Sequence, residues 1–270
     1  MFHSGRASGT ISSVYPRGWF VVAFTDEALP GASTTMRYFG QWLRLTRGDG
    51  APEDAPAEVH DTAGRPWPTL VRNGFVFVHH DPDGPGAAPR FDIPLLAEVG
   101  DPTWQPWVHQ SLRLRTHPRE IVENVADRAH FLPVHDTLNL SFETEFDGHR
   151  ATQRSHGHGG SDPNITFTSD ATYFGPGYQI TRLETLGAPS LLVNAHTMID
   201  EGELDLRFGV MLRRSSHSAA FAPAYVNMLQ RGFLQDVKIW EHKVWRDHPV
   251  LCDGDGPIMK LRKWYAQFYR

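Results

Sequence analysis

The chain has 270 residues, which is enough for one large domain or two small ones. Its hydrophobic fraction of 40% and charged fraction of 21% are ordinary for a folded protein, which excludes a disordered chain or a coiled coil. The formal net charge of -5 gives no basic surface, so nucleic acid and acidic membranes are not expected partners; a small molecule or another protein is.

The N-terminal part is predicted to be a small β module. Alternating apolar residues predict strands over residues 14–24, 36–45 and 70–78, and Asn73-Gly74 suits a tight hairpin turn. Residues 48–68 are rich in glycine, proline and acidic residues and predict a loop. A second proline- and glycine-rich stretch, residues 81–89, predicts a boundary, so we expect domains at residues 1–90 and 91–270.

The second part mixes strands and helices, which gives an α+β fold class. A strand is expected over residues 108–116 and a helix over residues 119–129, where Pro118 follows a capping position. Further strands are expected over residues 140–146, 165–168, 178–183, 191–197 and 206–211, in one antiparallel sheet. After Ala224 the period becomes helical, and a last helix is expected over residues 257–265.

The number of cysteines limits the possible metal sites, and the absence of long apolar runs bears on location. Cys252 is the single cysteine, which excludes an internal disulfide and any cysteine-ligated zinc or iron–sulfur site built from this chain alone. Neither an apolar signal core in residues 1–6 nor a run near the roughly 18–20 apolar residues of a membrane span is present. We therefore expect a cytoplasmic protein without a membrane span.

The stretch from Glu123 to His135 concentrates polar groups in apolar, helix-compatible sequence. His130 and His135 are separated by four residues, and Pro133 between them is expected to end the helix, so that the second imidazole bends back towards the first. Imidazole is the commonest metal ligand. The pair therefore predicts two ligands of one metal ion.

Asp236 is the candidate for a third ligand. It shares a helix face with Leu229, Phe233 and Trp240, and a carboxylate on an apolar face needs a partner such as a metal ion. Two histidines and one carboxylate form the site of non-haem iron(II) oxygenases. The alternative is that both histidines form ordinary core hydrogen bonds and that Asp236 pairs with Arg231 or Lys238.

The same stretch resembles the catalytic-domain signature E-N-x-x-D-x-x-H-F-x-x-V-H of the Rieske non-haem iron oxygenases. Residues 235–240 resemble the later segment that carries the iron carboxylate, and residues 255–265, 15–24 and 72–78 resemble the ketosteroid hydroxylase and cholesterol desaturase branch. The resemblance implies a helix-grip-like catalytic domain, in which a curved antiparallel sheet holds a long C-terminal helix. It also implies Fe(II) on His130, His135 and Asp236, and a homotrimer.

One departure from the family is informative. Members carry C-x-H and C-x-x-H pairs for a Rieske cluster in the N-terminal module, whereas residues 48–68 hold His60 and no cysteine. We therefore expect no iron–sulfur cluster in this chain and interpret residues 1–90 as a truncated Rieske-like module. A separate electron-donor protein is then one expected partner.

Asp127 and Asn124 are the candidate catalytic residues beside the metal. In the family the matching aspartate links the cluster of one subunit to the iron of its neighbour, so Asp127 implies either a borrowed cluster or support of His130. An ion pair with Arg128 or Arg119 is the structural alternative. Asn124 either points into the same pocket or is an exposed helix residue.

Three functional hypotheses follow. The first is an iron enzyme that cyclises, desaturates or oxygenates a bulky apolar polycyclic or polyketide-like molecule, as in natural-product biosynthesis. The second is a redox-neutral cyclase or isomerase that reuses the apolar pocket. The third is a subunit that pairs with a cluster-bearing protein.

Two other segments are weaker candidates. Residues 154–160 contain His156 and His158, which either bind a metal or lie in a flexible glycine-rich loop. Four aromatic residues either line a substrate cavity or belong to the sheet core: Phe167, Tyr173, Phe174 and Tyr178.

Overall fold

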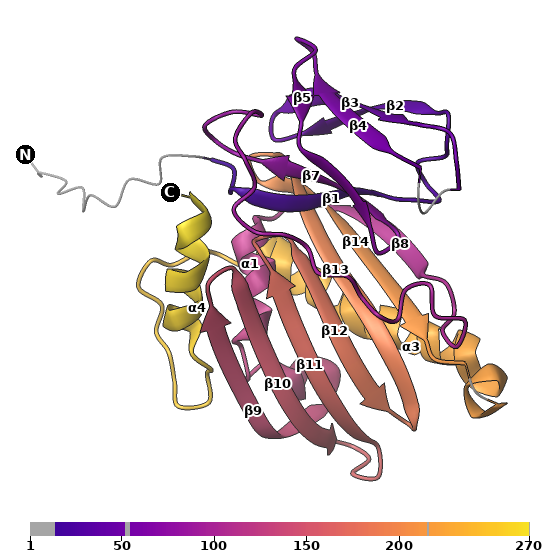
Figure 1. Ribbon diagram of the computed structural model, residues 1–270. Helices are drawn as coiled ribbons and strands as arrows, with labels where there is room; N and C mark the ends of the chain where they lie inside the picture. Colours follow the sequence, from indigo (N-terminus) through magenta and orange to yellow (C-terminus); the bar gives the residue numbers. More distant parts are fainter. Residues whose placement is uncertain (1–13, 52–54, 215, 270) are drawn as a thin grey trace, which may run out of the picture.

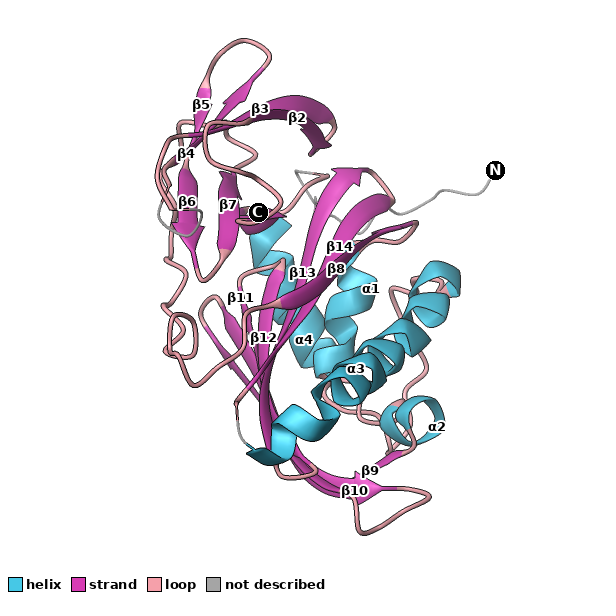
Figure 2. Cartoon of the chain, turned by 90° about the vertical axis from the view of Figure 1, so that its right-hand side faces the viewer, coloured by secondary structure: helices cyan, strands magenta, loops and turns pink. Residues whose placement is uncertain are grey.

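Figure 1 shows the computed structural model, which describes residues 14–51, 55–214 and 216–269. Two small sheets from the N-terminal part pack at one end of a large antiparallel sheet. Helices lie along one face of the large sheet, which curves around them (Figure 2). The expectation drawn from residues 1–6 falls outside the described residues.

The first small sheet has the strand order β1-β7-β6, from β1 (Gly18–Phe24), β7 (Phe75–His80) and β6 (Thr69–Arg72). The predicted turn between the last two is confirmed, since Asn73 and Gly74 both have positive φ angles, 58° and 82°. The second sheet has the order β2-β3-β4-β5, from β2 (Ser33–Tyr38), β3 (Gln41–Arg47), β4 (Ala57–Asp61) and β5 (Pro66–Trp67).

Two predictions about these sheets were wrong. Residues 36–45 form a hairpin rather than one strand, because Phe39 and Gly40 have positive φ angles of 53° and 72° that reverse the chain. The predicted loop over residues 48–68 contains β4 and β5, although residues 52–54 lie outside the described part. Val59, which is fully buried in β4, provides the core contact that the proline-rich composition concealed.

The large sheet has seven antiparallel strands in the order β8-β14-β13-β12-β11-β10-β9. Their bounds are β8 (Val108–Leu114), β9 (Thr137–Asp147), β10 (Arg150–Gly159), β11 (Thr166–Phe174), β12 (Tyr178–Thr185), β13 (Ala188–Asp200) and β14 (Glu203–Leu212). Apart from β8, each strand pairs with the next in sequence, so the chain runs as a meander from β9 to β14. The predicted antiparallel sheet is confirmed.

Residues 154–159, for which the glycines favour a flexible loop over a metal site, instead belong to strand β10. Gly157 lies at a register irregularity between β9 and β10, and a Cβ atom there would come within 1.9 Å of the Leu138 carbonyl oxygen. Glycine is required by this close approach of two backbones rather than by flexibility. The structure also gives His156 and His158 partners other than a metal: Ser141 for the first and the Gly159 carbonyl for the second.

The helices are α1 (Pro118–Val122), η1 (Glu123–Val125), α2 (Phe131–His135), α3 (Ser216–His242), α4 (Ile258–Tyr265) and η2 (Ala266–Tyr269). The single helix predicted over residues 119–129 is wrong, since it breaks into α1, η1 and a turn. Pro133 lies inside α2 rather than ending a helix. In a helix of one turn its missing N–H removes little, since the first N–H groups have no intrahelical partner.

Helix α3 packs its apolar stripe on the large sheet, as its spacing predicts. Val226, Leu229 and Phe233 contact Phe208 and Val210 of β14. Further along, Val237 and Trp240 pack with a second set of apolar residues: Leu114, Ile121, Leu204 and Leu206. The α+β class with a curved sheet against a long helix is therefore confirmed.

The opposite face of the large sheet packs on the N-terminal module. Trp19 and Val21 of β1 share one core with Tyr178 and Ile180 of β12 and with Val193 of β13. This common core fixes the module against the sheet. The boundary near residue 90 stays a prediction.

His196 of β13 is an imidazole without exposure to solvent. Its exposed fraction is 0%, and neither ring nitrogen has a hydrogen-bond partner among the described residues. Burial, with a smaller effect from nearby His117, lowers the pKa of His196 to about 3. The stability that a neutral His196 provides is complete above the unfolded pKa and is lost as the pH falls towards the folded pKa.

Replacing His196 by Leu is therefore expected to make the protein less sensitive to acid. Between about pH 6.5 and pH 5 the wild-type chain should lose about 1.4 kcal/mol of unfolding free energy per pH unit more than the variant. Urea unfolding at a series of pH values measures this difference. Parallel pH profiles of the two proteins would contradict the neutral, buried state of His196.

Candidate metal centre and cavity

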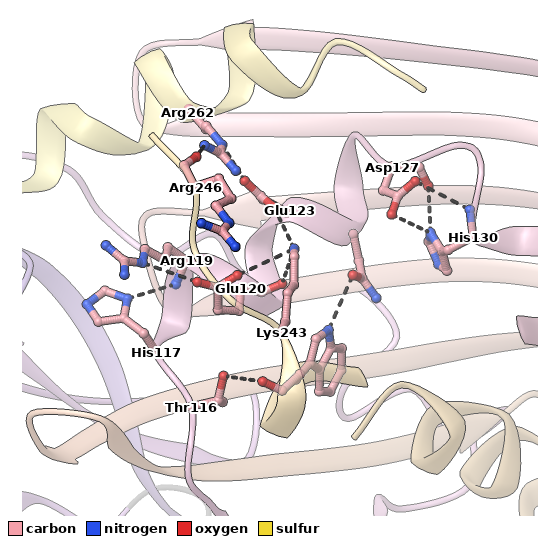
Figure 3. Close-up of polar contacts among 12 residues, drawn as sticks. Thr116, His117, Arg119, Glu120, Glu123, Asp127, His130, Lys243, Arg246 and Arg262 are labelled. Carbon is pink, nitrogen blue, oxygen red and sulfur yellow. Dashed lines mark hydrogen bonds and ion pairs between the residues drawn. The ribbon is translucent and has the colours of Figure 1, made fainter. Parts of the chain in front are cut away.

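His130 lies at the start of α2, directly after the turn that follows η1. Its Nδ1 lies 2.7 Å from the backbone carbonyl oxygen of Asp127, and because a carbonyl only accepts, Nδ1 carries the proton. In the neutral imidazole, which is the form that binds metals, this leaves the other nitrogen, Nε2, as the ligand atom. Figure 3 shows the His130 ring held by Asp127.

His135 is the last residue of α2, so the one-turn helix carries both imidazoles on its two ends. The two ring centroids are 5.3 Å apart. Nδ1 of His135 donates to Oε1 of Gln235 at 3.2 Å, and Nε2 lies 3.3 Å from Oδ2 of Asp236. Burial works to lower the pKa of His135, but the Asp236 carboxylate outweighs burial and the pKa is raised.

Asp236 lies on α3, and its position on the cavity side is the one that the helical spacing predicts. The residue is buried, with 7% of its surface exposed. Among the described residues its ion-pair partner is His135, and no pair with Arg231 or Lys238 is present. Each of the three side chains offers a ligand atom within 4.8 Å of the other two.

This donor set fits a mononuclear iron ion. Two imidazole nitrogens and one carboxylate oxygen converge, and both imidazoles have Nδ1 bound to an oxygen acceptor that fixes the ring and directs Nε2 to the other groups of the site. Gln235 was not singled out from the sequence. The sequence signal that could have identified Gln235 is its position directly before Asp236.

Asp127 supports His130 through both its backbone and its side chain. Its Oδ1 accepts from the backbone N–H groups of Ala129 and His130 at 3.0 and 3.3 Å, and its Oδ2 lies 3.6 Å from His130 Nδ1. Burial works to raise the pKa of Asp127, but hydrogen bonds with His130 outweigh burial and lower the pKa below its ordinary value. Within the described chain no ion pair joins Asp127 to Arg128 or Arg119.

Asn124 lines the cavity rather than lying on an exposed helix face. Its Oδ1 accepts from the indole Nε1 of Trp240 at 3.3 Å, which ties η1 to the end of α3 near the metal ligands. The catalytic roles predicted for Asp127, as the link to a borrowed cluster, and for Asn124 stay predictions.

A charged cluster around two buried glutamates, Glu120 and Glu123, lies beside these residues along α1 and η1 (Figure 3). Glu123 binds Lys243 through Oε2, at 2.5 Å, and Arg262 through Oε1. Glu120 lies 3.5 Å from the same lysine. The cluster therefore joins three parts of the chain: η1, the segment after α3, and α4.

A cavity of about 610 Å³ lies beside the three candidate metal ligands, between the large sheet and α3. This volume is in the range of small-molecule sites. Of the four aromatic residues predicted to line a cavity or fill the core, Phe167 and Tyr173 line it. Phe174 and Tyr178 point to the other face of the sheet, where they pack with the N-terminal module.

With this geometry established, comparison with known proteins places the chain. Residues 78–269 match the family of the 3-ketosteroid 9α-hydroxylase C-terminal domain. The chain belongs to this family of Rieske oxygenases. The predicted resemblance is thereby confirmed, whereas deletion of the cluster-binding region stays a prediction.

Relatives of this ketosteroid hydroxylase family differ in how much of their length the chain covers. The oxygenase component of a 3-ketosteroid-9-alpha-monooxygenase from Rhodococcus rhodochrous is 38% identical over 224 residues, which are 76% of this chain and 57% of that protein. The chain thus spans little more than half of that relative. Cholesterol 7-desaturase of Caenorhabditis elegans is 26% identical over 98% of this chain and 79% of its own length.

The fold is also that of solved Rieske oxygenase structures. Dicamba monooxygenase bound to dicamba superimposes with a TM-score of 0.74 over 93% of this chain and 96% of that chain, at 13% identity. At this identity the likeness concerns the fold alone. Within the described residues, no helix is both long enough and apolar enough to span a bilayer.

Proposed function

We propose that this protein is an oxygen-dependent, mononuclear non-haem iron oxygenase that acts on a bulky, apolar, polycyclic small molecule. His130, His135 and Asp236 would hold Fe(II). The observation that carries the proposal is the convergence of these three ligand atoms at the wall of a large cavity, in a chain of the ketosteroid hydroxylase family.

The protein's own residues have defined tasks in this proposal. Asp127 and Gln235 hold the two imidazoles with Nε2 directed to the metal, and Asn124 fixes Trp240 at the cavity wall. The apolar lining, from residues such as Phe167, Phe208 and Leu229, excludes water from the substrate. Iron, when bound, supplies the activation of oxygen that no side chain can provide.

The substrate class follows from the cavity and from the relatives. The cavity is broad and largely apolar, and relatives are named as acting on ketosteroids or cholesterol. A rigid multi-ring molecule fits both observations. Hydroxylation or desaturation is therefore favoured over the cyclisation that the sequence also allowed.

The electrons would come from a separate protein. A Rieske cluster needs two cysteines and two histidines, and residues 1–270 contain the single cysteine Cys252, which is exposed. Residues 1–90 would then serve as a truncated module that covers the back of the sheet. The homotrimer implied by the resemblance and the cytoplasmic location are further parts of this proposal.

The test is anaerobic reconstitution with Fe(II), followed by reaction with a steroid ketone, a chemical reductant and isotopically labelled oxygen. We expect one iron ion per chain, retained through gel filtration. We also expect a product that is either hydroxylated with labelled oxygen or desaturated, and that forms only when oxygen is present. His130→Ala is expected to retain no iron, and exposed His242→Ala, on the same side of the sheet, serves as the control. Failure to retain iron, or equal turnover without oxygen, would overturn the proposal.

A further inference from the structure

Asp136, the residue after the candidate ligand His135, ends α2 in a conformation that is unusual for a residue with a side chain. Its φ and ψ angles are 49° and 42°, and its backbone N–H bonds to carbonyl oxygens of the single turn before it. A helix of one turn has little stability of its own. The position of the His135 backbone therefore depends on how Asp136 is held.

The side chain of Asp136 offsets the cost of this left-handed conformation, which favours glycine. Its Oδ2 accepts from the backbone N–H of Ser161 at 3.1 Å, and its backbone carbonyl accepts from the N–H of Gly160 at 2.7 Å. Both donors belong to residues 160–165, the connection between β10 and β11, which we call the rim loop. Asp136 thus joins the end of α2 to the rim loop through two hydrogen bonds.

The rim loop approaches this end of α2 closely. A Cβ atom added at Gly160 would collide with Oδ1 of Asp136 and would lie within 2.9 Å of Cδ1 of Leu132. The φ angle of Gly160 is not positive, so the lack of space, rather than the backbone conformation, explains the glycine. Both sides of the contact, an acidic side chain and a glycine, suit the approach.

The rim loop is compact and forms part of the cavity wall. Oδ1 of Asp162 accepts from the backbone N–H and the side-chain amide of Asn164, at 3.0 and 2.9 Å, and the carbonyl of Asp162 accepts from the N–H of Ile165. Ser161, Asp162 and Ile165 line the cavity although all three are exposed. The loop therefore lies where the cavity wall meets the solvent.

The two candidate imidazole ligands are held in different ways. For His130, Asp127 accepts hydrogen bonds from both the ring and the backbone N–H. For His135 the two tasks are divided, since Gln235 binds the ring and Asp136 holds the end of the helix. A displacement of about 1 Å in such a support is enough to spoil the geometry of a site.

We propose that Asp136 is a positioning residue that fixes His135 by tying the end of α2 to the rim loop, so that the metal site and the rim of the cavity are ordered together. The proposal rests on the proposed function, because it concerns a ligand of the same metal ion. Asp136 is neither a metal ligand nor a proton donor in this role. It acts through the position of His135.

Two substitutions of Asp136 separate the role of its side chain from that of its backbone. Asp136→Gly removes the bond to Ser161 and relieves the left-handed backbone, whereas Asp136→Asn keeps an acceptor oxygen and tolerates that backbone. If Asp136 served only to end the helix, glycine would be neutral or better than the wild-type residue. We expect the opposite order, with Asp136→Asn close to wild type and Asp136→Gly impaired.

The test is anaerobic binding of Co(II) to the full-length protein, because Co(II) takes the same imidazole and carboxylate ligands and its visible absorption reports their geometry. Asp136→Gly is expected to bind Co(II) about 10-fold more weakly than wild type, with an altered visible spectrum. Asp136→Asn should bind within about threefold of wild type, with an unchanged spectrum. Asp101→Gly is the matched control, since Asp101 also accepts a backbone N–H, from Thr103 at 2.7 Å, but does not line the cavity.

A variant on the other side of the contact tests the same link with Asp136 in place. Ser161→Pro removes the N–H donor and should weaken Co(II) binding as Asp136→Gly does. The double variant should bind no more weakly than the single variants, because both changes remove the same bond. Hydrogen exchange of the metal-free protein gives a reading that needs no metal: the Ser161 N–H should be protected in wild type and should exchange faster in Asp136→Gly.

The outcomes distinguish this inference from the proposed function. Equal Co(II) affinities and identical spectra of wild type and Asp136→Gly would overturn the inference alone. So would equal losses in Asp136→Asn and Asp136→Gly, or a Ser161 N–H that is unprotected in wild type. Wild-type protein that binds neither Co(II) nor Fe(II) would overturn the inference together with the proposed function.

Discussion

The Asp236→Ala variant is expected to fold normally and to lose iron. Asp236 supplies the one carboxylate among the three converging ligand atoms, and two imidazoles on a one-turn helix leave most of the coordination sphere to water. Loss of an outer-shell partner weakens metal binding about 10- to 100-fold, so loss of a ligand should exceed about 100-fold. Competition with a chromophoric chelator under anaerobic conditions measures this change.

Matched variants separate the loss of a ligand from a loss of structure. Asp236→Glu keeps a carboxylate and should recover part of the affinity, whereas Glu241→Ala, exposed on the same helix, should leave iron binding unchanged. Thermal unfolding of the metal-free proteins shows whether the cavity wall is intact. Undiminished iron binding by a folded Asp236→Ala protein would show that the third ligand lies elsewhere.

Glu123→Ala is expected to destabilise the protein by up to about 3 kcal/mol, because it removes a buried carboxylate from two partly buried cations and leaves Lys243 with Glu120 alone. The side chain of Glu123 is 6% exposed, and it binds Lys243 and Arg262 at once. Its removal takes away the ion pairs that join η1 to the segment after α3 and to α4. Urea unfolding of the metal-free protein measures the free energy directly.

The exposed pair of Glu145 with Arg154 provides the control for Glu123. Both side chains are more than half exposed, and removal of Glu145 should cost no more than about 1 kcal/mol. Glu123→Gln should fall between the two, since its amide oxygen can still accept one hydrogen bond. A Glu123→Ala protein as stable as Glu145→Ala would contradict the structural role of the cluster.

The proximity of the three candidate metal ligands could be predicted from the sequence because two local rules apply to them. His130 and His135 are close in the chain, and the apolar spacing of α3 places Asp236 on the buried face. What spacing could not provide was the contact between segments about a hundred residues apart. The family signature supplied that link, and the 3.3 Å approach of His135 to Asp236 agrees with it.

The residues of the sheet that line the cavity could not be predicted from the sequence in the same way. Gln153 lies on a strand that its glycines disguised, and the glycine at position 157 is explained only by the Leu138 backbone of the neighbouring strand. Likewise, alternation along β11 could not decide which aromatic residues face the cavity. Tyr173 and Phe174 are adjacent and therefore lie on opposite faces of the sheet. Only the positions of α3 and of the N-terminal module show which face lines the cavity.

Helix α2 has a further consequence for the way the site works. Together with its N-cap His130 it carries two of the three candidate metal ligands and part of the cavity wall, yet none of its five residues is buried. Segments with little buried surface open locally at low free-energy cost. Iron bound by residues of α2 and α3 would link His135 to Asp236. Its binding free energy would then add to the stability of α2. We therefore expect metal loading to stabilise α2, and with it this part of the cavity wall, against local unfolding.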